Sequence, residues 1–389
     1  MTTPQMPVAA VISQLPLLVV GGGERFTINA HLSAIRGGVP ADLWCVSHGQ
    51  PDDAPHASRM EQPYHRLRND AGTVAVVETV PLRELLRRQA DYRIVHIHQY
   101  LRSATTLDML AAASPWQRTV LTSHGCEPIA ELFVKTFEGH PGVEIIEVSR
   151  YAAARATARG LAASHVSAAI WESAIRERPA RGRRPGQLNA VAVGRLLPHK
   201  GFDVAIEAVA GMPDDVTLAV IGPSSGDAQY EARLRKLAAR TTSVELTGYV
   251  ADDVREALLA GADVLVANSS HDDYRGARVE QPELFGLVIL EGLAGGLLPI
   301  ASDIPSFREI AEEVGLVDWL YPERDVAALQ ERLAAAAGLS LGERQALVAA
   351  ATERMRRAFL WDDYWARLEG QGAAVWPRVA ADTARDRAA

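Results

Sequence analysis

Eight residues from Gly194 to Gly201, GRLLPHKG, combine a glycine turn with two positive charges. They directly follow the apolar run NAVAV, which is typical of a buried strand. Arg195 offers a planar fork that matches phosphate oxygens, and Lys200 offers a compact point charge. Lysine is rare in this chain, where Lys135 and Lys236 are its only other occurrences, so a geometric need for Lys200 is indicated. The segment predicts a diphosphate-binding turn; an ordinary solvated basic loop is the alternative.

A second segment, from Glu283 to Glu291 (ELFGLVILE), follows the apolar strand ADVLVANSS and a polar loop. We expect a helix to begin near Gly286, with Glu283 just before it and Glu291 two turns inside it. Free amides at a helix N-terminus suit an anionic diphosphate. Each carboxylate can accept hydrogen bonds from a pair of vicinal hydroxyls, which both ribose and sugar rings carry. The alternative is a capped helix with Glu291 on its solvent face.

A metal ion would be another way to neutralise a diphosphate. Asp252 and Asp253 stand where a helix should start, and helix N-terminal charge complementarity accounts for them. Asp272 and Asp273 lie in a polar loop, where we expect them to be solvated. Two cysteines in the whole chain are too few for a thiolate metal site. We therefore predict no metal site and no metal requirement.

The elements that must position these residues alternate between short apolar runs and amphipathic helical patterns, as in βαβ units around parallel sheets. Helical patterns include VPLRELLRRQ and SRYAAARATARG, and residues 48–72 are polar enough to predict a long loop or lid. The expected strands are VAAVISQLPLLVV, DLWCVS, YRIVHIHQ, RTVLTSHG and VEIIEVS in the first half, and NAVAVGR, TLAVIG, VELTGYV, ADVLVANSS and LLPIAS in the second.

Clustered arginine, proline and glycine at 176–187 indicate a linker between two α/β domains. The predicted Rossmann-like domains span residues 1–175 and 188–354. An apolar, aromatic helix is expected near 355–370, and a disordered tail at 376–389. Ligands bind beyond the carboxyl ends of such parallel strands, so two facing sheets create a cleft.

The composition excludes several classes of function. A chain of 389 residues with 48% hydrophobic and 23% charged residues is typical of a globular protein of two domains. The net charge of -8 argues against a nucleic-acid backbone or an anionic membrane as main partner. No apolar run approaches the roughly 20 residues that span a bilayer, and no signal peptide is evident. We expect a cytoplasmic protein without stable membrane association. The sequence does not indicate its oligomeric state.

The order of the two motifs looks like that of the retaining glycosyltransferases of family 4. GRLLPHKG is followed some eighty residues later by two glutamates around FGLVIL. GGGE at 21–24 resembles the family's first glycine-rich turn, VHIHQ and VLTSHG its mid-domain strands, and IIEVSRY its end-of-domain serine segment. FLWDDYWARL resembles the final helix, within 355–375, that crosses back onto the first domain. The resemblance implies a GT-B fold, two Rossmann-like doubly wound parallel sheets facing across a cleft, with the nucleotide-sugar donor on the C-terminal domain and the acceptor on the N-terminal domain.

The resemblance also implies residue roles. Arg195 and Lys200 should bind the donor diphosphate, Glu283 the hydroxyls of the transferred sugar, and Glu291 those of the ribose. His124 should contact the donor sugar from the acceptor domain. Further donor-binding residues that it implies are Gly22, Gly23, Gly194, Gly248, Tyr249, Phe285, Gly286, Leu287 and Val288.

The predicted reaction follows from charge. Departure of a nucleoside diphosphate places negative charge on the β-phosphate, where Arg195 and Lys200 can stabilise it. Glycoside hydrolases instead need two carboxylates flanking the anomeric carbon, and no nucleophile is evident here. The resemblance implies retention through attack on the same face. A UDP- or GDP-sugar is the expected donor, no further cofactor is expected, and the departing phosphate itself can take the acceptor's proton.

Three departures from the family pattern bear on the acceptor. The segment 268–282 is longer and more charged than usual, so Tyr274, Arg275 and Arg278 form either a specificity element or a plain surface insertion. The segment ERFTINAHLSAIRGG, which follows the first glycine turn, is less apolar than expected, so Arg25, Phe26 and Asn29 are assigned to the acceptor side. The crossover segment HVSAAIWESAIRERP lacks the usual asparagine-glycine turn. An acidic protein favours a soluble small-molecule acceptor, such as an antibiotic-type aglycone.

Other classes of function stay open. A nicotinamide-dependent oxidoreductase would need G-x-G-x-x-G, and the third spaced glycine is absent after Gly21, although Asp42 lies near the distance for a ribose ligand. A phosphorylase or a nucleotide-sugar epimerase would share the phosphate site. A non-catalytic sugar-binding protein would share the fold without turnover.

Overall fold

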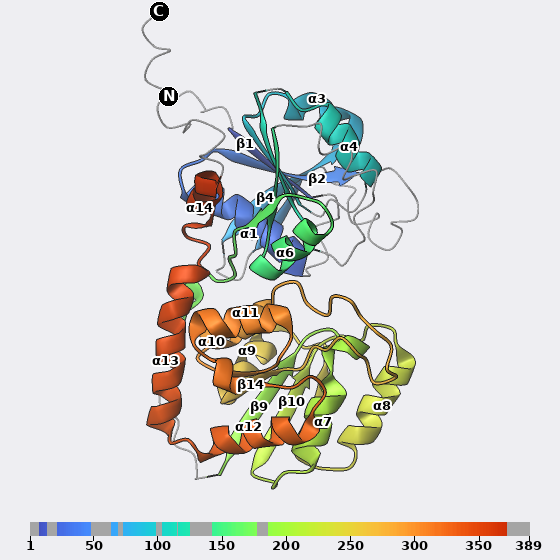
Figure 1. Ribbon diagram of the computed structural model, residues 1–389, viewed down its shortest axis with the longest axis vertical. Coiled ribbons are helices and arrows are strands. Elements are labelled where there is room, and N and C mark those ends of the chain that lie inside the picture. The colour runs from blue at the N-terminus through green and yellow to red at the C-terminus, as the bar shows by residue number, and fades with distance from the viewer. Residues whose placement is uncertain are drawn as a thin grey trace, which may run out of the picture.

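A computed structural model describes residues 8–13, 22–47, 64–68, 73–98, 103–114, 116–124, 142–176 and 186–371. The chain forms two lobes, each built on its own sheet, stacked along the long axis of the molecule (Figure 1). We call the elements from β1 to η2 the N-lobe and those from β9 to α13 the C-lobe. The predicted α/β class with two Rossmann-like sheets is confirmed.

The N-lobe sheet has eight strands in the order β3-β4-β2-β1-β5-β6-β7-β8. Its strands are parallel except for β3, which pairs antiparallel with β4 at the edge. Strands β1, β5 and β6 are buried along their whole length, as expected for central parallel strands covered on both faces. The N-lobe strands are β1 Ala9–Ser13, β2 Ala41–Ser47, β3 Tyr64–Arg68, β4 Val74–Pro81, β5 Ile94–His98, β6 Arg118–Thr122, β7 Val143–Glu147 and β8 Ala163–His165; its helices are α1 Gly22–Arg36, α3 Leu82–Gln89, α4 Ser103–Ala111, α6 Arg150–Ala158 and η2 Glu172–Ala174.

The C-lobe sheet has six parallel strands in the order β11-β10-β9-β12-β13-β14. Order reverses beside β9, so the chain after β9 and the chain after β12 meet at the carboxyl edge of the sheet. The C-lobe strands are β9 Leu188–Val193, β10 Val216–Ile221, β11 Val244–Gly248, β12 Val264–Ala267, β13 Leu298–Ser302 and β14 Leu320–Tyr321. Its helices are η3 Pro198–Lys200, α7 Phe202–Ala210, α8 Ala228–Ala238, α9 Asp252–Gly261, α10 Leu287–Ala294, α11 Pro305–Val314, η4 Val317–Trp319, α12 Val326–Gly338 and α13 Leu341–Ala358.

The expected helix near 355–370 is wrong as a single element. α13 ends at Ala358, and α14 covers Tyr364–Gln371 on the N-lobe (Figure 1). Between them the backbone pairs with residues 169–170: the N–H groups of Ala169 and Ile170 donate to Phe359 O at 2.9 and 3.2 Å, and Trp361 N donates to Ile170 O at 2.9 Å. These bonds use backbone groups that a continuous helix would need for itself.

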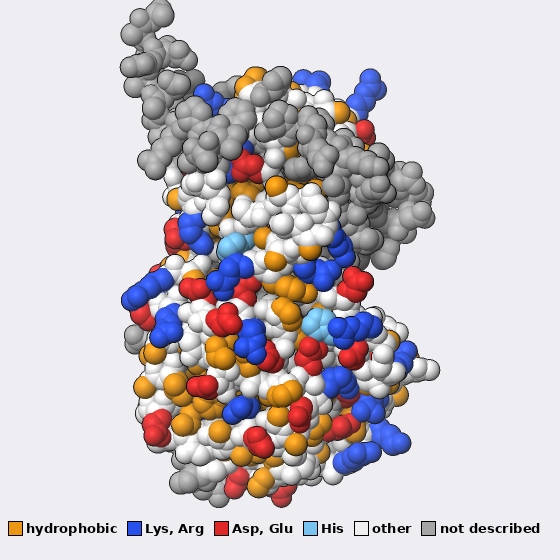
Figure 2. Space-filling view, viewed as in Figure 1, with side chains coloured by type: hydrophobic (Ala, Val, Ile, Leu, Met, Phe, Trp, Pro, Cys, Tyr) orange, Lys and Arg blue, Asp and Glu red, His pale blue; other side chains and the backbone are white. Residues whose placement is uncertain are grey.

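Other expectations fall partly outside the described residues. β3 lies within the predicted loop 48–72, and residues 48–63 and 69–72 are not described. The same holds for 177–185 of the linker and for the tail, so the domain boundaries stay a prediction. Strands β4, β8 and β14 were not expected at all. Among the described helices, none combines the length and apolarity of a membrane span. Acidic and basic side chains are interspersed over the C-lobe on the face shown in Figure 2, with no field of one sign.

Candidate active site

Three glycines form a shelf of backbone at the carboxyl edge of the C-lobe sheet. Gly194, Gly222 and Gly248 follow or end β9, β10 and β11, with φ of 153°, 156° and 69°. Gly194 N donates to Ile221 O at 2.9 Å, and Gly222 N donates to Gly248 O at 3.0 Å. A Cβ on Gly222 would lie 1.8 Å from the carbonyl oxygen of Gly194, so no other residue fits there. Added Cβ atoms at Gly222 and Gly194 would meet protein atoms, whereas nothing lies within 4 Å of one at Gly248, and Tyr249 beside it is 79% exposed.

Lys200 is held by the turn in which it lies. Gly201 has φ of 62°, and a Cβ on it would lie 2.2 Å from the carbonyl oxygen of Asn268. The GRLLPHKG turn therefore packs directly on the chain that leaves β12. This packing brings Lys200 Nζ into an ion pair with Glu283, whose Oε1 also accepts from Ser269 Oγ at 3.3 Å. The two motifs predicted to act together thus meet.

The Lys200 and Glu283 side chains are 23% and 19% exposed, so the pair is accessible to a ligand. Arg195 is exposed, and no described carboxylate lies within ion-pair distance of its guanidinium. The structure therefore joins Lys200 to Glu283 and leaves Arg195 on the surface of the same turn. Ser269 was not predicted; its only signal was its position at the carboxyl end of the expected strand ADVLVANSS.

The predicted helix start is confirmed. α10 begins at Leu287 with Gly286 as its N-cap, and Gly286 has φ of 117°. Phe285 is buried and packs its ring 5.7 Å from that of Phe359, so only its backbone can face a ligand. Glu291 lies one turn into α10, where two turns were expected. Leu287 and Val288 supply the first helical amides, which no intrahelical carbonyl accepts.

The two lobes meet at this helix. Arg25 Nη1 of α1 lies 2.7 Å from Glu291 Oε1, an ion pair across the cleft. A Cβ on Gly22 would lie 3.4 Å from Cδ1 of Leu287. Gly22 and Gly23 are the first two residues of α1, and Gly21 lies outside the described residues. The structure therefore places Gly22 against the N-terminus of α10, and it places Arg25 on the predicted ribose-binding carboxylate.

His124 follows β6 on the N-lobe side. Its Nε2 lies 2.9 Å from Nδ1 of His98, and its ring centroid lies 4.9 Å from that of Phe26. Burial lowers the pKa of His124 to about 3, so its imidazole is neutral. His98 ends the buried strand β5, and it was not singled out from the sequence.

The assignment of Phe26 and Asn29 to the acceptor side does not fit their burial in the structure. Phe26 and Asn29 are 2% and 4% exposed. Asn29 Oδ1 accepts from Trp171 Nε1 at 2.9 Å, and Phe26 packs beneath His124 and against Trp361 at 4.6 Å. Both side chains lie within the packing under α1. Neither presents a surface to an acceptor.

The segment 268–282 folds back onto the C-lobe. The Tyr274 ring lies parallel to that of Tyr230 at 5.3 Å, with the Arg233 and Arg275 guanidinium groups 5.4 and 4.8 Å from its centroid. Arg278 pairs with Asp272 at 3.3 Å. This segment is therefore anchored by aromatic and charged contacts.

The expectation that Asp273 is solvated is wrong. It is 8% exposed, and its Oδ1 accepts from the backbone N–H groups of Arg275 and Ala277 at 2.7 and 2.9 Å. Asp273 therefore organises the turn. Asp252 begins α9, as predicted. Within the described ranges, no three His, Cys, Asp or Glu side chains are grouped as a metal site would need.

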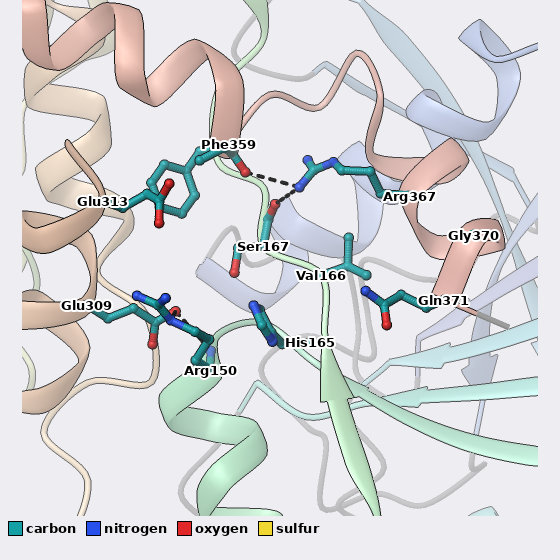
Figure 3. A pocket seen from close by; sticks show the side chains of 11 residues that line it. Arg150, His165, Val166, Ser167, Glu309, Glu313, Phe359, Arg367, Gly370 and Gln371 are labelled. Atoms are coloured by element: carbon teal, nitrogen blue, oxygen red, sulfur yellow. Dashed lines mark hydrogen bonds and ion pairs between the residues drawn. The ribbon is translucent and has the colours of Figure 1, made fainter. Parts of the chain in front are cut away.

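A cavity of about 300 Å³ lies at the joint between the lobes, and none of the predicted site residues lines it (Figure 3). Two of its charged groups, Glu309 and Arg367, bind backbone groups of the protein. Glu309 of α11 accepts from the backbone N–H groups of Arg150 and Tyr151 at 2.9 and 2.8 Å, which caps α6 of the other lobe. Arg367 donates to the carbonyls of Ser167, Ala358 and Leu360 at 2.8–3.0 Å. We therefore interpret this cavity as part of the contact between the two lobes and not as the candidate active site.

Residues 174–354 match the family model described as glycosyl transferases group 1. The phosphatidyl-myo-inositol mannosyltransferase of Mycobacterium leprae is 32% identical over 187 residues, which are 47% of this chain and 44% of that protein. The chain spans less than half the length of the curated relatives it matches.

Two solved structures are similar in fold to this chain over 95% of its length. HepE of Anabaena, crystallised with UDP and glucose, has a TM-score of 0.69 at 13% identity over 95% of this chain and all of that one. AviGT4, a glycosyltransferase involved in avilamycin A biosynthesis, has a TM-score of 0.58 at 18% identity over 95% of this chain and 98% of that one. At these identities the likeness concerns the fold. The C-terminal part of the chain, residues 174–354, therefore matches the group 1 glycosyltransferases, and the chain as a whole has the GT-B fold.

Proposed function

We propose that this protein is a retaining glycosyltransferase of family 4, which moves a hexose from a UDP- or GDP-sugar to a soluble small-molecule acceptor without a metal ion. The observation that carries the proposal is the meeting of Lys200 and Glu283 in a partly exposed ion pair. This pair lies at the carboxyl edge of the parallel sheet. The pair supports a nucleotide-sugar site because a cation suited to phosphate and a carboxylate suited to sugar hydroxyls lie side by side there.

The proposed chemistry uses charge that is already in place. The donor diphosphate binds Lys200, which then leaves its ion pair with Glu283, and it also binds the exposed Arg195. Glu283 accepts hydrogen bonds from hydroxyls of the transferred sugar. As the bond from the anomeric carbon to the β-phosphate oxygen breaks, both cations and the N-terminal amides of α10 stabilise the developing negative charge. The acceptor oxygen attacks from the same face. Its proton passes to an oxygen of the departing phosphate.

The donor site has a second part at Glu291. Its carboxylate is bound by Arg25 in the structure, so ribose hydroxyls must share or replace that guanidinium. The pair is about a quarter exposed, and pairs of this kind contribute only about 0–1 kcal/mol. A bidentate contact with two hydroxyls can therefore displace Arg25 at small cost.

The soluble acceptor is supported by the net charge of -8. The mannosyltransferase relative is named for a phosphatidyl-inositol, a lipid, which makes the lipid acceptor the competing case. Radiolabelled UDP- and GDP-sugars offered with soluble aglycones and, separately, with vesicles containing phosphatidylinositol separate the two. Label that transfers only to vesicle lipid would overturn this part of the proposal.

Lys200→Ala tests the proposed diphosphate site, with Lys236→Ala as the matched control. Lys236 lies in the last turn of α8, exposed and away from the glycine shelf. Loss of one electrostatic stabiliser of the transition state costs about 10²–10³ in kcat, and we expect that loss for Lys200→Ala. The control should retain wild-type turnover, and EDTA should change neither protein. Wild-type turnover of Lys200→Ala, with unchanged unfolding temperature, would contradict the assignment of Lys200 to the diphosphate site.

A further inference from the structure

Three histidines lie in one layer between the N-lobe sheet and α1. His96 and His98 are two residues apart on β5, so their side chains share one face of the sheet, and both are fully buried. Their ring centroids are 4.0 Å apart. His124 extends this layer to the cleft, with its ring plane only 12° from that of His98 and its side chain partly exposed.

The inner end of this layer has a fixed tautomer. Thr122 Oγ1 donates its single proton to the carbonyl of Ile146 at 2.6 Å. The same oxygen lies 2.9 Å from Nε2 of His96, so it can only accept there. His96 therefore carries its proton on Nε2.

The contact between His98 and His124 holds one proton between two nitrogens. Burial lowers the pKa of both imidazoles far below neutrality, so both are neutral and one must donate to the other. His98 Nε2 is buried and has no hydrogen-bond partner among the described residues. A proton on that nitrogen would be a buried, unpaired N–H, whereas a proton on Nδ1 leaves only an unused lone pair there. Orphaned buried N–H groups are rarer than unused acceptors.

We propose that His98 is a positioning residue, which donates from Nδ1 to His124 Nε2 and so fixes His124 as the tautomer with its proton on Nδ1. The second nitrogen of His124 is then a hydrogen-bond donor for an oxygen of the bound ligand. The tautomer follows from the packing alone. Its use toward a hydroxyl of the transferred sugar rests on the proposed glycosyltransferase function.

Nitrogen-15 NMR of the full chain, labelled at histidine, reads the tautomers directly. We expect two-bond correlations that assign Nδ1–H to His124 and Nε2–H to His96, with the signals assigned through His124→Asn and His96→Asn. A His124 imidazole with its proton on Nε2 would overturn the inference. This readout is independent of activity, so it decides the His98 assignment even if the protein transfers no sugar.

A pair of substitutions tests the consequence for transfer. In His98→Asn the side-chain amide nitrogen takes the place of Nδ1 and keeps a donor to His124, whereas His98→Leu fills the space without one. We expect kcat/KM for the sugar donor to fall about tenfold or more in His98→Leu, as for loss of about 1.4 kcal/mol, and to stay within about threefold in His98→Asn. The Kd of the free nucleoside diphosphate, which lacks the transferred sugar, should change in neither. Equal loss in both variants, or loss in neither, would contradict the positioning role.

Discussion

At the scale of single residues, both acidic groups of the candidate site are already paired with cations from distant parts of the chain. Glu283 binds Lys200, and Glu291 binds Arg25 of the other lobe. A ligand therefore exchanges one set of charge contacts for another. The gain on binding is reduced by whatever each internal pair contributes, which is small for partly exposed pairs.

Arg25→Gln is expected to strengthen nucleoside diphosphate binding. Removing the guanidinium frees Glu291 for the ribose, and the gain is limited to about fivefold because the pair contributes about 1 kcal/mol at most. Glu291→Gln should weaken binding instead. Isothermal titration with the diphosphate that binds best measures both. Weakening of tenfold or more in Arg25→Gln would show that Arg25 is itself a donor ligand.

The sequence was informative for Lys200, Glu283 and Gly286, because each follows a strand or precedes a helix of strong apolar pattern. It could not predict that Arg25 reaches Glu291, since that contact depends on how two lobes dock. The burial of Asn29 could not be predicted either, because it also depends on a contact between distant parts of the chain. Its partner Trp171 is 142 positions away, and no local pattern marks the pair.

At the scale of elements, the glycine shelf fixes how closely the turns after β9 and β10 approach. The short distance from Gly222 to the Gly194 carbonyl leaves no space for a methyl group. The turn that carries Arg195 and Lys200 starts at Gly194. Its position therefore depends on a backbone contact, which no side-chain pattern encodes.

Gly222→Ala is expected to destabilise the protein by about 3 kcal/mol, through the clash and the left-handed backbone together, and to weaken diphosphate binding. Gly342→Ala in α13 is the control, because nothing lies within 4 Å of its added methyl group. A helical glycine-to-alanine change there should be neutral or stabilise by up to about 1 kcal/mol. Urea unfolding measures both. A Gly222→Ala protein as stable as wild type would refute the shelf geometry.

Ten of the expected strands are found in the structure, because central parallel strands read as continuous apolar runs. β4 was missed because it has an edge-like alternation of buried and exposed residues and runs directly into α3. The break between α13 and α14 was missed because the backbone partners of 359–361 lie at 169–170, far away in the sequence.

At the scale of the whole molecule, the lobes are joined by specific polar contacts. Ser149 Oγ donates to Leu284 O at 2.6 Å, beside the candidate site, and Glu309 caps α6 from α11. Ser33 Oγ of α1 donates to Trp361 O at 2.7 Å, where the chain returns to the N-lobe before α14. A ligand that changes the relative position of the lobes must therefore break or rearrange these hydrogen bonds.

Acid should destabilise the N-lobe through its buried histidines. Burial lowers the pKa of His31 to about 4 and that of His96 and His124 to about 3, and it holds that of His98 well below its usual range. In the unfolded chain these groups bind protons below about pH 6.5, while the folded state stays neutral. Unfolding therefore takes up protons, and stability falls as the pH drops below 6.5.

Each such histidine contributes a slope of about 1.4 kcal/mol per pH unit once the unfolded form is fully protonated. Urea unfolding between pH 7 and 5 should show a steepening loss below pH 6.5. His31→Asn removes one such histidine and should reduce the slope by about one proton. A stability that is flat from pH 7 to 5 would contradict the burial of these rings.

The central claim is that a nucleoside diphosphate binds at the Lys200–Glu283 pair. We would measure the unfolding temperature of the protein with UDP, GDP, ADP, dTDP and NAD, each with and without magnesium, because ligands of the native state raise it by mass action. We expect a rise with UDP or GDP that is independent of magnesium and is lost in Lys200→Ala, and we expect none with NAD. A rise with NAD alone, or with none of the diphosphates, would contradict it.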